Sequence, residues 1–363
     1  MLILNKEKVL FFGPIPEPYT GQSISFKQVF ENFNSKKILF NSTKFKNYKV
    51  LNSFYCLCVL PFIFIFNKFD KIYFTCTRSK LGFIKDFQLL LLAQIFKKKV
   101  VNHLHGADLV SFYNNSFFLK GLIKWSYNNI DANIILLPSM KDQFSIFKTS
   151  KIYTVYNCYS SDFENYELEL SLKKKQVVFL SNLIFSKGIF VFLEAISKLL
   201  VKDKELVIKI AGLPMGDEFM TSKKVEVKFN EISQTLKNQF PDRYFYLGMV
   251  KGSDKEELLK ESSVFILPTF YKTEAFPLTI IEAMYFGNAI ITTNHNYLND
   301  VISSKNGALI EVGSFNEIVN NIILLFQDEN RLQKIQKFNH EEALLKYNPK
   351  AFDFKVGEII NNL

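Results

Sequence analysis

Short apolar segments alternate with amphipathic stretches along almost the whole chain, and this alternation restricts the possible folds more than any other feature. In the first half, strands are expected at Val9–Phe12, Ile38–Phe40, Ile72–Thr75, Val100–His103, Asn133–Leu137 and Ile152–Val155. Helices are expected between them, at Ser23–Asn34, Ile84–Phe96, Phe117–Asn129 and Ser139–Phe147. Short strands that alternate with helices predict a parallel sheet covered by helices on both faces.

The pattern restarts after a polar segment, Tyr156–Lys175, which we interpret as an interdomain linker. Further strands are expected at Val177–Leu180, Val207–Ala211, Tyr244–Leu247, Val264–Leu267, Ala289–Thr292 and Ala308–Ile310. Helices are expected at Gly188–Leu200, Val225–Asn238, Lys255–Lys260, Leu278–Phe286 and Asn316–Phe326. Each half of the 363-residue chain is long enough to bury its own core.

These halves predict an α/β protein with two doubly wound, Rossmann-like domains that face a central cleft, at residues 1–165 and 166–345. The last stretch, residues 346–363, is expected to form a helix and is a candidate to pack back across the interface. Ligands of such sheets bind beyond the carboxyl ends of the strands, so the loops that follow strands are the first places to look for a site.

The net charge of +10 belongs to the first half alone. Residues 1–165 carry 21 Lys and Arg against 10 Asp and Glu, a balance of +11, and the rest carry the remaining 24 and 25. No helix-turn-helix, zinc-finger or RNP pattern accompanies this charge, so no nucleic-acid partner is expected. Contact with an anionic membrane surface and an ordinary solvated, Lys-rich surface both stay open.

Cysteine usage and the N-terminal sequence indicate a cytoplasmic protein. The four cysteines show neither a Cys-x-x-Cys pair nor the spacing of a disulfide framework: Cys56, Cys58, Cys76 and Cys158. Residues 1–12 lack the long apolar stretch of a signal peptide, because Gly13 and Pro14 interrupt it. The longest apolar run, Phe54–Phe66, contains Pro61 and is shorter than the roughly 20 residues that span a bilayer. It predicts a buried or interfacial helix, and we expect the protein at the inner face of the plasma membrane.

Several common nucleotide and hydrolase patterns are absent from the sequence. It contains no G-x-x-x-x-G-K-[ST], no G-x-G-x-x-G after a strand and no G-x-S-x-G. It also lacks an Asp-x-Asp triplet, so a metal-chelating diphosphate site of that kind is not indicated. Phosphate-loop NTPases and typical nicotinamide or flavin enzymes are therefore disfavoured.

The strongest positive signal is the block at residues 266–293, ILPTFYKTEAFPLTIIEAMYFGNAIITT. Glu274 lies in the loop after an expected strand, Phe276-Pro277 opens a helix, and Glu282 lies on that helix. The free N–H groups at such a helix start form an anion site. Two carboxylates beside it fit two hydroxyl-bearing groups that flank a phosphate, as in a nucleotide-sugar. The alternative, two solvated carboxylates, is weakened for Glu282 by its apolar sequence neighbours.

The block resembles the signature of family 4 glycosyltransferases, which retain the anomeric configuration and have the GT-B fold. The shared features are Glu-x7-Glu across a loop and a helix, then Ala-Met and a turn with Gly287. The resemblance implies that Glu274 contacts the donor sugar, that Glu282 contacts the ribose, and that backbone amides of residues 276–278 bind phosphate. Ala275 stands where family members often have Gly, which is a small change.

The segment at residues 177–196, VVFLSNLIFSKGIFVFLEAI, is similar to the first strand and loop of the family's donor domain. Lys187-Gly188 match the pattern, whereas Asn182 stands where an Arg is expected. Asn offers hydrogen bonds but no charge, so Lys187 and the helix start must neutralise more of the leaving group, or another cation assists. Without this context Lys187 would be an ordinary surface lysine at a helix start.

In the first half, VLFFGPIPEPYTGQSISF resembles the first strand and loop of the acceptor domain, with Gly13 and Gly21 close to the donor. The segment VVNHLHGADL places His103, His105 and Asp108 after an expected strand. A metal pair, a hydrogen-bonded structural His and, from the resemblance, a role for His105 beside the donor sugar are the alternatives.

The resemblance implies a retaining, metal-independent hexosyl- or related glycosyltransferase without a cofactor. The donor would be a nucleoside diphosphate sugar, UDP-sugar favoured and GDP-sugar possible. The acceptor would be a glycan or lipid-linked oligosaccharide in bacterial cell-surface polysaccharide synthesis, such as lipopolysaccharide or capsule. The implied catalytic residues are Glu274, His105 and Lys187, and the implied donor-binding residues are Gly13, Gly21, Asn182, Gly188, Ala275, Phe276, Pro277, Leu278 and Glu282. A GT-B protein that binds without transfer, which Asn182 would favour, and a sugar-nucleotide epimerase are the alternatives.

Overall fold

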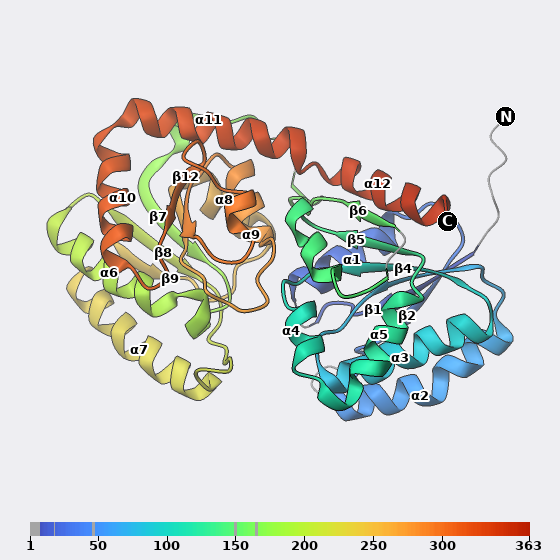
Figure 1. Cartoon of the computed structure of the whole chain (residues 1–363). Coiled ribbons are helices and arrows are strands. Elements are labelled where there is room, and N and C mark those ends of the chain that lie inside the picture. Colours follow the sequence, from blue (N-terminus) through green and yellow to red (C-terminus); the bar gives the residue numbers. More distant parts are fainter. Residues whose placement is uncertain (1–7, 18, 46–47, 149–150, 164–165) are drawn as a thin grey trace. The chain divides into compact units, whose positions relative to one another are not determined.

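The computed structural model describes residues 8–17, 19–45, 48–148, 151–163 and 166–363, and it shows an α/β chain with two compact units (Figure 1). Unit 1 contains the chain up to Asn157 together with Lys350–Leu363, and unit 2 contains Cys158–Pro349. Each unit has a six-stranded sheet in which every strand pair is parallel. The fold class expected from the alternation of strands and helices is confirmed.

The sheet of unit 1 has the order β2-β1-β3-β4-β5-β6. Its strands are β1 (Val9–Gly13), β2 (Lys37–Asn41), β3 (Lys71–Thr75), β4 (Lys99–Leu104), β5 (Ala132–Ile135) and β6 (Ile152–Thr154). Its helices are α1 (Gly21–Asn32), α2 (Lys49–Phe66), α3 (Lys80–Ile95), α4 (Leu109–Asn114), α5 (Lys120–Asn128) and α12 (Pro349–Asn361). All six strands expected from the sequence are present, with ends shifted by a residue or two.

Helices cover both faces of this sheet (Figure 1). α2, α3 and α5 form one layer, in which Phe64 contacts Phe96 at 5.4 Å between ring centroids and Phe87 contacts Trp125 at 5.8 Å. α12 packs beside α1, where Asn32 Nδ2 donates to Asp353 Oδ2 at 2.8 Å. The C-terminal helix is therefore part of unit 1.

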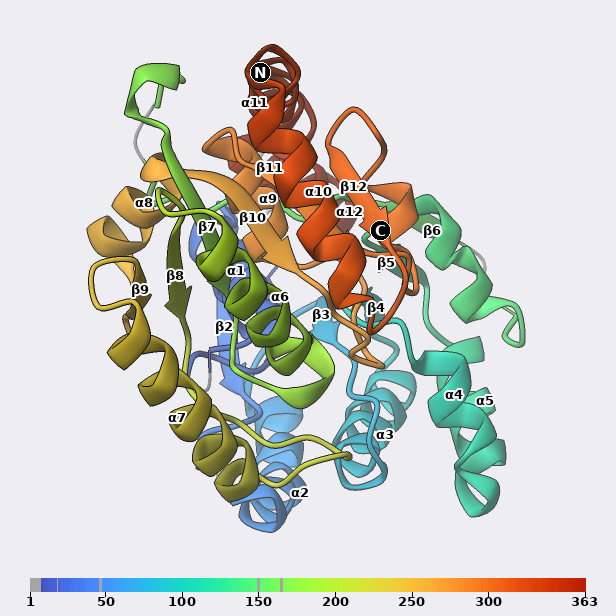
Figure 2. The ribbon, with the colours of Figure 1, turned by 90° about the vertical axis from the view of Figure 1, so that its left-hand side faces the viewer.

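The sheet of unit 2 has the order β12-β11-β10-β7-β8-β9 (Figure 2). Its strands are β7 (Lys174–Leu180), β8 (Val207–Ala211), β9 (Tyr244–Tyr246), β10 (Ser262–Leu267), β11 (Ala289–Thr293) and β12 (Gly307–Ile310). Its helices are α6 (Ile189–Lys202), α7 (Ser222–Gln239), α8 (Gly252–Glu261), α9 (Leu278–Tyr285), α10 (Phe315–Gln327) and α11 (Glu329–Lys346). Because β7 pairs with both β8 and β10, the strand order reverses between β7 and β10. Ligands bind at such a reversal.

Several sequence-based expectations for helices differ from the structure. The segment Ser139–Phe147 was expected to be an α-helix, but Pro138–Phe144 forms a 3₁₀ helix. α2 begins at Lys49, before the apolar run that marked it, and neither α4 nor α11 was expected. The last two helices are separate because Asn348 and Pro349 interrupt the pattern, and a helix cannot continue through the residue before a proline without strain.

The boundary between the units lies after Asn157, earlier than the expected boundary at residue 165. Aromatic side chains that follow it pack against Tyr285 of α9. Ring centroids of Tyr159, Phe163 and Tyr166 lie 4.0, 5.9 and 6.2 Å from that of Tyr285. The segment interpreted as a linker thus contributes to the core of unit 2, because burying several aromatic rings is strongly favourable.

A buried carboxylate fixes the turn that leads into α3. Asp86 Oδ2 accepts hydrogen bonds from Thr77 N at 2.7 Å and Thr77 Oγ1 at 2.8 Å. Burial raises the pKa of the Asp86 carboxyl from 3.8 to about 7, although the hydrogen bonds from Thr77 oppose this shift. The folded chain therefore retains a proton at Asp86 that the unfolded chain loses at lower pH.

The first prediction concerns the pH dependence of stability. Between about pH 4 and pH 7 the unfolded chain ionises at Asp86 before the folded chain does, so the free energy of unfolding falls as pH rises. The loss amounts to roughly 1.4 kcal/mol for each unit of pKa shift. In Asp86→Asn, whose side-chain oxygen still accepts from Thr77, this part of the pH dependence should vanish. Urea unfolding of both proteins across this range tests it, and parallel profiles would contradict it.

Candidate functional site

Two loops meet at the carboxyl ends of β7 and β10, where the strand order of unit 2 reverses. The loop after β7 contains a 3₁₀ turn, Phe185–Lys187, and the loop after β10 leads into α9. Phe270 N donates to Ser186 O at 2.7 Å, and Thr269 Oγ1 donates to the same oxygen at 3.3 Å. These hydrogen bonds hold the two loops together.

Gly188 permits this close approach. Its φ of 81° is left-handed, and a Cβ built on it would lie 2.1 Å from Pro268 O. No side chain fits at that distance, so the residue must be glycine for two independent reasons. The Lys-Gly pair expected from the sequence to mark a donor site therefore also has a packing role.

Lys187 and Glu274, two of the expected catalytic residues, form an ion pair between the two loops. The side chain of Lys187 is 14% exposed and that of Glu274 is 9% exposed. Thr269 Oγ1 donates to Glu274 Oε2 at 3.3 Å, and Lys187 Nζ lies 5.1 Å from the ring centroid of Tyr271. The structure thus brings together a cation and a carboxylate from positions 87 residues apart.

Residues after β11 support the loop that carries Glu274. Asn296 Nδ2 donates to Glu274 O at 2.8 Å, and His295 Nε2 lies 3.1 Å from Tyr271 O. Asn296 has a φ of 49°, a conformation that Asn tolerates better than most residues. These positioning residues were not expected from the sequence, in which their only signal is the Asn-His-Asn run that directly follows a strand.

The helix start that the sequence predicts to be an anion site is the start of α9. Pro277 is its N-cap residue, and among the described residues no side chain caps this helix start. Ala275 and Phe276 are buried beside it, and Leu278 is the first helical residue. The first N–H groups of a helix carry partial positive charge, so this start favours an anion.

Glu282 is buried on α9 and forms an ion pair with a residue that the sequence analysis missed. Lys255 Nζ of α8 lies 2.5 Å from Glu282 Oε2, and the Glu282 side chain is 6% exposed. A buried carboxylate without a counter-charge would be costly, and Lys255 removes most of that cost. The Glu282 side chain therefore lies beside a cation at the edge of the same site.

Asn182, which replaces the expected Arg, is exposed in the loop after β7. The backbone around it is fixed, since Asn182 O accepts from Ile184 N at 2.9 Å and Ser181 N donates to Ala211 O at 3.1 Å. The exposed amide side chain can therefore reach a ligand at the carboxyl edge of the sheet without disturbing the loop.

In unit 1, His105 follows β4 and stacks on His103, with ring centroids 4.1 Å apart. Both ring nitrogens of His105 are buried and lack a hydrogen-bond partner among the described residues. Burial, His103 and the cation of Arg78 hold the pKa of His105 well below its usual value. His105 is therefore a neutral imidazole with unused donor and acceptor capacity.

The metal alternative for the two histidines finds no support among the described residues. His103 Nδ1 lies 2.7 Å from Tyr73 Oη, and Asp108 Oδ1 accepts from Arg78 Nε at 2.5 Å. No three His, Cys, Asp or Glu side chains converge in the described part of the chain. His103 is a hydrogen-bonded structural histidine, and Asp108 is the partner of an arginine.

Arg78 was not singled out by the sequence analysis, although it is the only arginine before residue 243. Its guanidinium packs on Gly106, where a Cβ would lie 2.6 Å from the Arg78 side chain. Because β1 pairs with both β2 and β3, the loops after β1 and β3 flank the strand reversal of unit 1. Arg78 therefore supplies a fixed positive charge to that edge.

The two glycines expected near the donor have different surroundings. A Cβ on Gly13 would lie 2.5 Å from the ring of Phe26, so Gly13 allows α1 to pack closely on β1. Gly21 is the exposed first residue of α1. The start of α1 is capped by Thr20, whose side chain accepts from Ser23 N at 3.1 Å. Unlike the start of α9, it already has an acceptor for its N–H groups.

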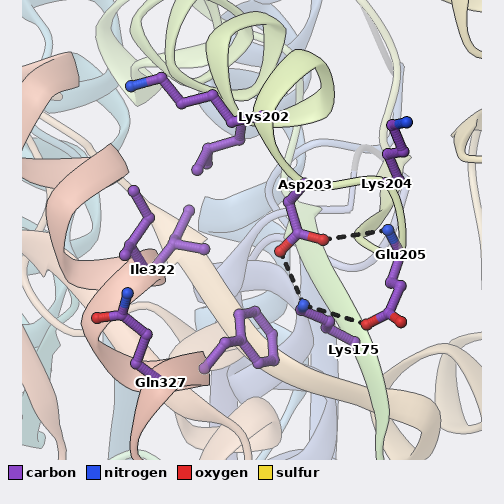
Figure 3. A pocket seen from close by; sticks show the side chains of 10 residues that line it. Lys175, Lys202, Asp203, Lys204, Glu205, Ile322 and Gln327 are labelled. Atoms are coloured by element: carbon purple, nitrogen blue, oxygen red, sulfur yellow. Dashed lines mark hydrogen bonds and ion pairs between the residues drawn. The ribbon is translucent and has the colours of Figure 1, made fainter.

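Unit 2 also has a pocket of about 450 Å³ away from the loops after β7 and β10, and Figure 3 shows the side chains that line it. Its lining comes from the start of β7, the turn between α6 and β8, and α10. Lys175 pairs there with Asp203 at 2.8 Å and with Glu205 at 3.4 Å. The pocket lies at the amino edge of the sheet, so it belongs to a different end of the unit from the loops with Lys187 and Glu274.

Residues 161–342, half of the chain, match the family model described as glycosyl transferases group 1. No curated protein is significantly similar in sequence. Among solved structures, sucrose-phosphate synthase from Thermosynechococcus elongatus has a TM-score of 0.76 at 14% identity, covering 98% of each chain. HepE from Anabaena in complex with UDP has a TM-score of 0.70 at 17% identity, covering 98% of this chain and 100% of that chain.

A glycosyltransferase from Rickettsia africae has a TM-score of 0.69 at 18% identity, covering 99% of this chain and 98% of that chain. At these identities the similarity shows the fold. It confirms the expected GT-B architecture with two Rossmann-like domains over nearly the whole chain.

The second prediction tests the close approach at Gly188. Gly188 and Gly313 share a φ of 81°, but a Cβ on Gly313 meets nothing within 4 Å. Gly313→Ala should lower the free energy of unfolding by about 1–2 kcal/mol through backbone strain alone. Gly188→Ala should cost about 1–3 kcal/mol more, because the Pro268 carbonyl must move. Urea unfolding of both variants measures the difference, and equal losses would contradict the packing role.

Proposed function

Because this chain belongs to the glycosyl transferases of group 1, we propose that it transfers a sugar from a nucleoside diphosphate sugar to a hydroxyl group of its acceptor. We propose retention of the anomeric configuration and no metal requirement, as expected from the resemblance to family 4. The observation that carries the proposal is the Lys187–Glu274 ion pair at the strand reversal, beside the uncapped start of α9.

The leaving diphosphate is the group that these residues must stabilise. In the proposal Lys187 exchanges its partner when the donor binds, from the Glu274 carboxylate to a phosphate oxygen. The N–H groups at the start of α9, around Leu278, bind the same diphosphate. Charge-assisted hydrogen bonds that are already positioned stabilise charge as it develops in the transition state.

The exchange would release Glu274 at the moment when the sugar arrives. Its carboxylate accepts hydrogen bonds only, which suits sugar hydroxyl groups. Thr269 and the backbone contact of Asn296 hold the Glu274 loop in place, so the carboxylate needs only a side-chain rotation. In the proposal one ion pair thus prepares both a phosphate contact and a sugar contact.

Glu282 is proposed to accept from the ribose hydroxyl groups. Lys255 supports this role because its ammonium lies 2.5 Å from the buried Glu282 Oε2. Asn182 supplies hydrogen bonds without charge where relatives of family 4 have Arg. Lys187 and the helix start then carry most of the charge compensation.

His105 is proposed to contact the donor sugar, and Gly13 and Gly21 to line the donor site. The unpartnered, neutral imidazole of His105 supports its role, because it can donate to and accept from hydroxyl groups without desolvating a charge. Burial lowers the pKa of His105 most, and the nearby His103 and the positive charge of Arg78 lower it further, which keeps the imidazole neutral.

We propose a glycan or lipid-linked acceptor in the synthesis of a bacterial cell-surface polysaccharide such as lipopolysaccharide or capsule. The proposed location is the cytoplasmic face of the plasma membrane. The balance of +11 in residues 1–165 supports contact with anionic lipid. A solvated Lys-rich surface would have the same charge but no dependence on lipid.

The third prediction concerns the donor base. HepE was solved with UDP and with UDP-glucose, and this similarity favours UDP among the possible bases. A ligand that binds the folded state raises the melting temperature in proportion to the logarithm of its concentration over its Kd. UDP-sugars should raise the melting temperature more than GDP- or ADP-sugars at equal concentration. A larger shift with a GDP-sugar would reject the UDP assignment and keep the nucleotide-sugar proposal.

The fourth prediction separates catalysis from binding at Glu274. Glu274→Gln should lower kcat for transfer by about 10²–10³-fold, because it removes a charged contact to the reacting sugar. The same variant should bind UDP at least as tightly as the wild type, since Glu274 no longer competes with phosphate for Lys187. Transfer assays and calorimetric titration with UDP measure the two effects.

Glu261→Gln is the matched control, because Glu261 is also ion-paired but lies at the amino end of β10. It should keep near wild-type transfer. Full transfer by Glu274→Gln would contradict the site assignment. Conversion of donor without acceptor by the wild type would indicate an epimerase, and donor binding without any turnover would indicate a binding protein.

A further inference from the structure

α2 presents an unusual outward face. Its buried residues repeat every four positions and pack inward: Asn52, Cys56, Leu60 and Phe64. The other side of the helix is exposed, although no charged residue occurs between Lys49 and Lys68. Exposed apolar side chains of α2 are Val50, Leu51, Phe54, Leu57, Phe62, Ile65 and Phe66. A soluble helix normally carries polar residues on its outward face.

Helix α7 shows the ordinary pattern and serves as an internal comparison. Both helices have 18 residues. The outward side of α7 carries charged side chains, among them Lys223, Lys224, Glu226 and Lys228. The apolar outward face of α2 is therefore a property of that helix and does not reflect the overall apolar composition of the chain.

The apolar surface continues onto α3. Gln88 Nε2 of α3 donates to Leu57 O of α2 at 3.0 Å, and Ser53 Oγ donates to Leu81 O at 3.5 Å, so the two helices run side by side. A stripe at helical spacing on α3 is exposed beside α2: Leu81, Ile84, Leu91 and Ile95. Figure 1 shows α2 and α3 in the same helical layer of unit 1.

α5 extends the same layer on the far side of α3. Trp125 of α5 contacts Phe87 of α3, and Leu122 is exposed. Just before α5, Phe117 and Phe118 are almost fully exposed, Phe118 at 94%. We call the exposed apolar residues of these three helices, together with Phe117 and Phe118, the α2–α3–α5 surface. Contiguous apolar surfaces of this kind mark sites of protein or membrane interaction.

Lysines flank this surface at both ends. Lys44, Lys49 and Lys80 lie near the starts of α2 and α3, and Lys68, Lys97 and Lys98 lie near their ends. Asp70 is the only carboxylate within five residues of these lysines in the sequence, so the segments at both ends of the surface carry a net positive charge. Lysine is depleted in protein interfaces but common where a helix meets lipid, because its long stem lies along the apolar region while the ammonium reaches the head groups.

We propose that the α2–α3–α5 surface docks on an anionic lipid bilayer, with α2 lying in the plane of the interface. The apolar side chains would enter the acyl boundary by about 5–10 Å, and the lysines would contact anionic head groups. Contact between two copies is disfavoured by the rims, since two lysine rims facing each other would repel.

α2 would lie on the membrane and not cross it. Among the residues that the structure describes, it is the one helix long and apolar enough to span a bilayer. However, α2 connects β2 to β3, and both strands pair with β1 in one sheet. A spanning α2 would draw this sheet to the depth of the hydrocarbon, where its polar loops could not be satisfied.

Co-sedimentation of the full chain with vesicles tests the proposal. The protein should bind vesicles made of equal parts phosphatidylglycerol and phosphatidylcholine, and bind phosphatidylcholine vesicles more weakly. Raising the salt concentration should weaken binding, because the lysine contacts are screened. Phe54→Ser should reduce partitioning by about tenfold, since one buried phenylalanine is lost from the lipid.

Phe354→Ser is the matched control. Phe354 is 71% exposed and Phe54 is 62% exposed, but Phe354 belongs to α12 in the other helical layer of unit 1. Its substitution should leave vesicle binding unchanged. Equal losses for the two variants would overturn the proposal, as would absence of binding to any vesicle.

A second readout locates the contact. Trp125 is the only tryptophan of the chain, and it lies on α5 within this surface. Vesicles containing brominated phosphatidylcholine should quench its fluorescence in the wild type and in Phe354→Ser. Vesicle binding without quenching would overturn the assignment of the surface.

Lipid docking by the α2–α3–α5 surface goes beyond the proposed sugar transfer, and either proposal can fail while the other holds. The melting-temperature rise with UDP should be the same in Phe54→Ser as in the wild type, which shows that the variant folds and binds donor. A concentration-dependent dimer that Phe54→Ser dissociates, without vesicle binding, would assign the surface to a second copy and overturn the lipid proposal.

Discussion

The ion pair between Lys187 and Glu274 depends on one close approach, and the proposed donor site depends on that pair. Gly188 lets the loop after β7 reach Pro268, and the Ser186 carbonyl then accepts from the loop after β10. Neither loop could hold a buried charge alone, because an isolated ion inside a protein is strongly disfavoured. Together the two loops hold the Lys187 ammonium and the Glu274 carboxylate beside the start of α9, which no side chain caps among the described residues.

Both units gather charged or polar side chains at the carboxyl edge of a parallel sheet, but the side chains differ. In unit 2 the edge carries two compensated carboxylates, Glu274 and Glu282. In unit 1 it carries the buried Arg78–Asp108 pair and a neutral His105. The outer helical layer of unit 1 has another character, since it exposes apolar side chains between lysines. The proposed donor site and the proposed membrane-docking surface thus occupy different parts of the fold.

The twelve strands could be predicted because buried parallel strands are short apolar runs. Such a run is visible in the local sequence even when the neighbouring strand is unknown. It did not predict α11, whose many charged residues leave only a narrow buried stripe. It also placed the start of α2 too late, because the first turn contains Lys49, Asn52 and Ser53. The expected domain boundary lies later in the chain than the observed one. Tyr159, Phe163 and Tyr166 pack on unit 2, but the polar residues between them made this segment resemble a linker.

Motif spacing placed Lys187 and Glu274 in loops that follow strands and Glu282 on the helix after the second loop, at the edge where ligands bind. Their partners could not be predicted in the same way. Lys255 and Asn296 are brought to the site by the fold, and nothing in their local sequence distinguishes them from surface residues. Arg78 had a signal, as the only arginine in a lysine-rich half, but its burial and its pairing with Asp108 required the structure.

The most direct measurement of the central claim is a crystal structure of the protein bound to UDP. The account predicts that Lys187 Nζ lies within about 3 Å of a phosphate oxygen, that N–H groups at the start of α9 donate to the diphosphate, and that Glu274 is released from Lys187. An intact Lys187–Glu274 pair, with the diphosphate bound elsewhere, would contradict it.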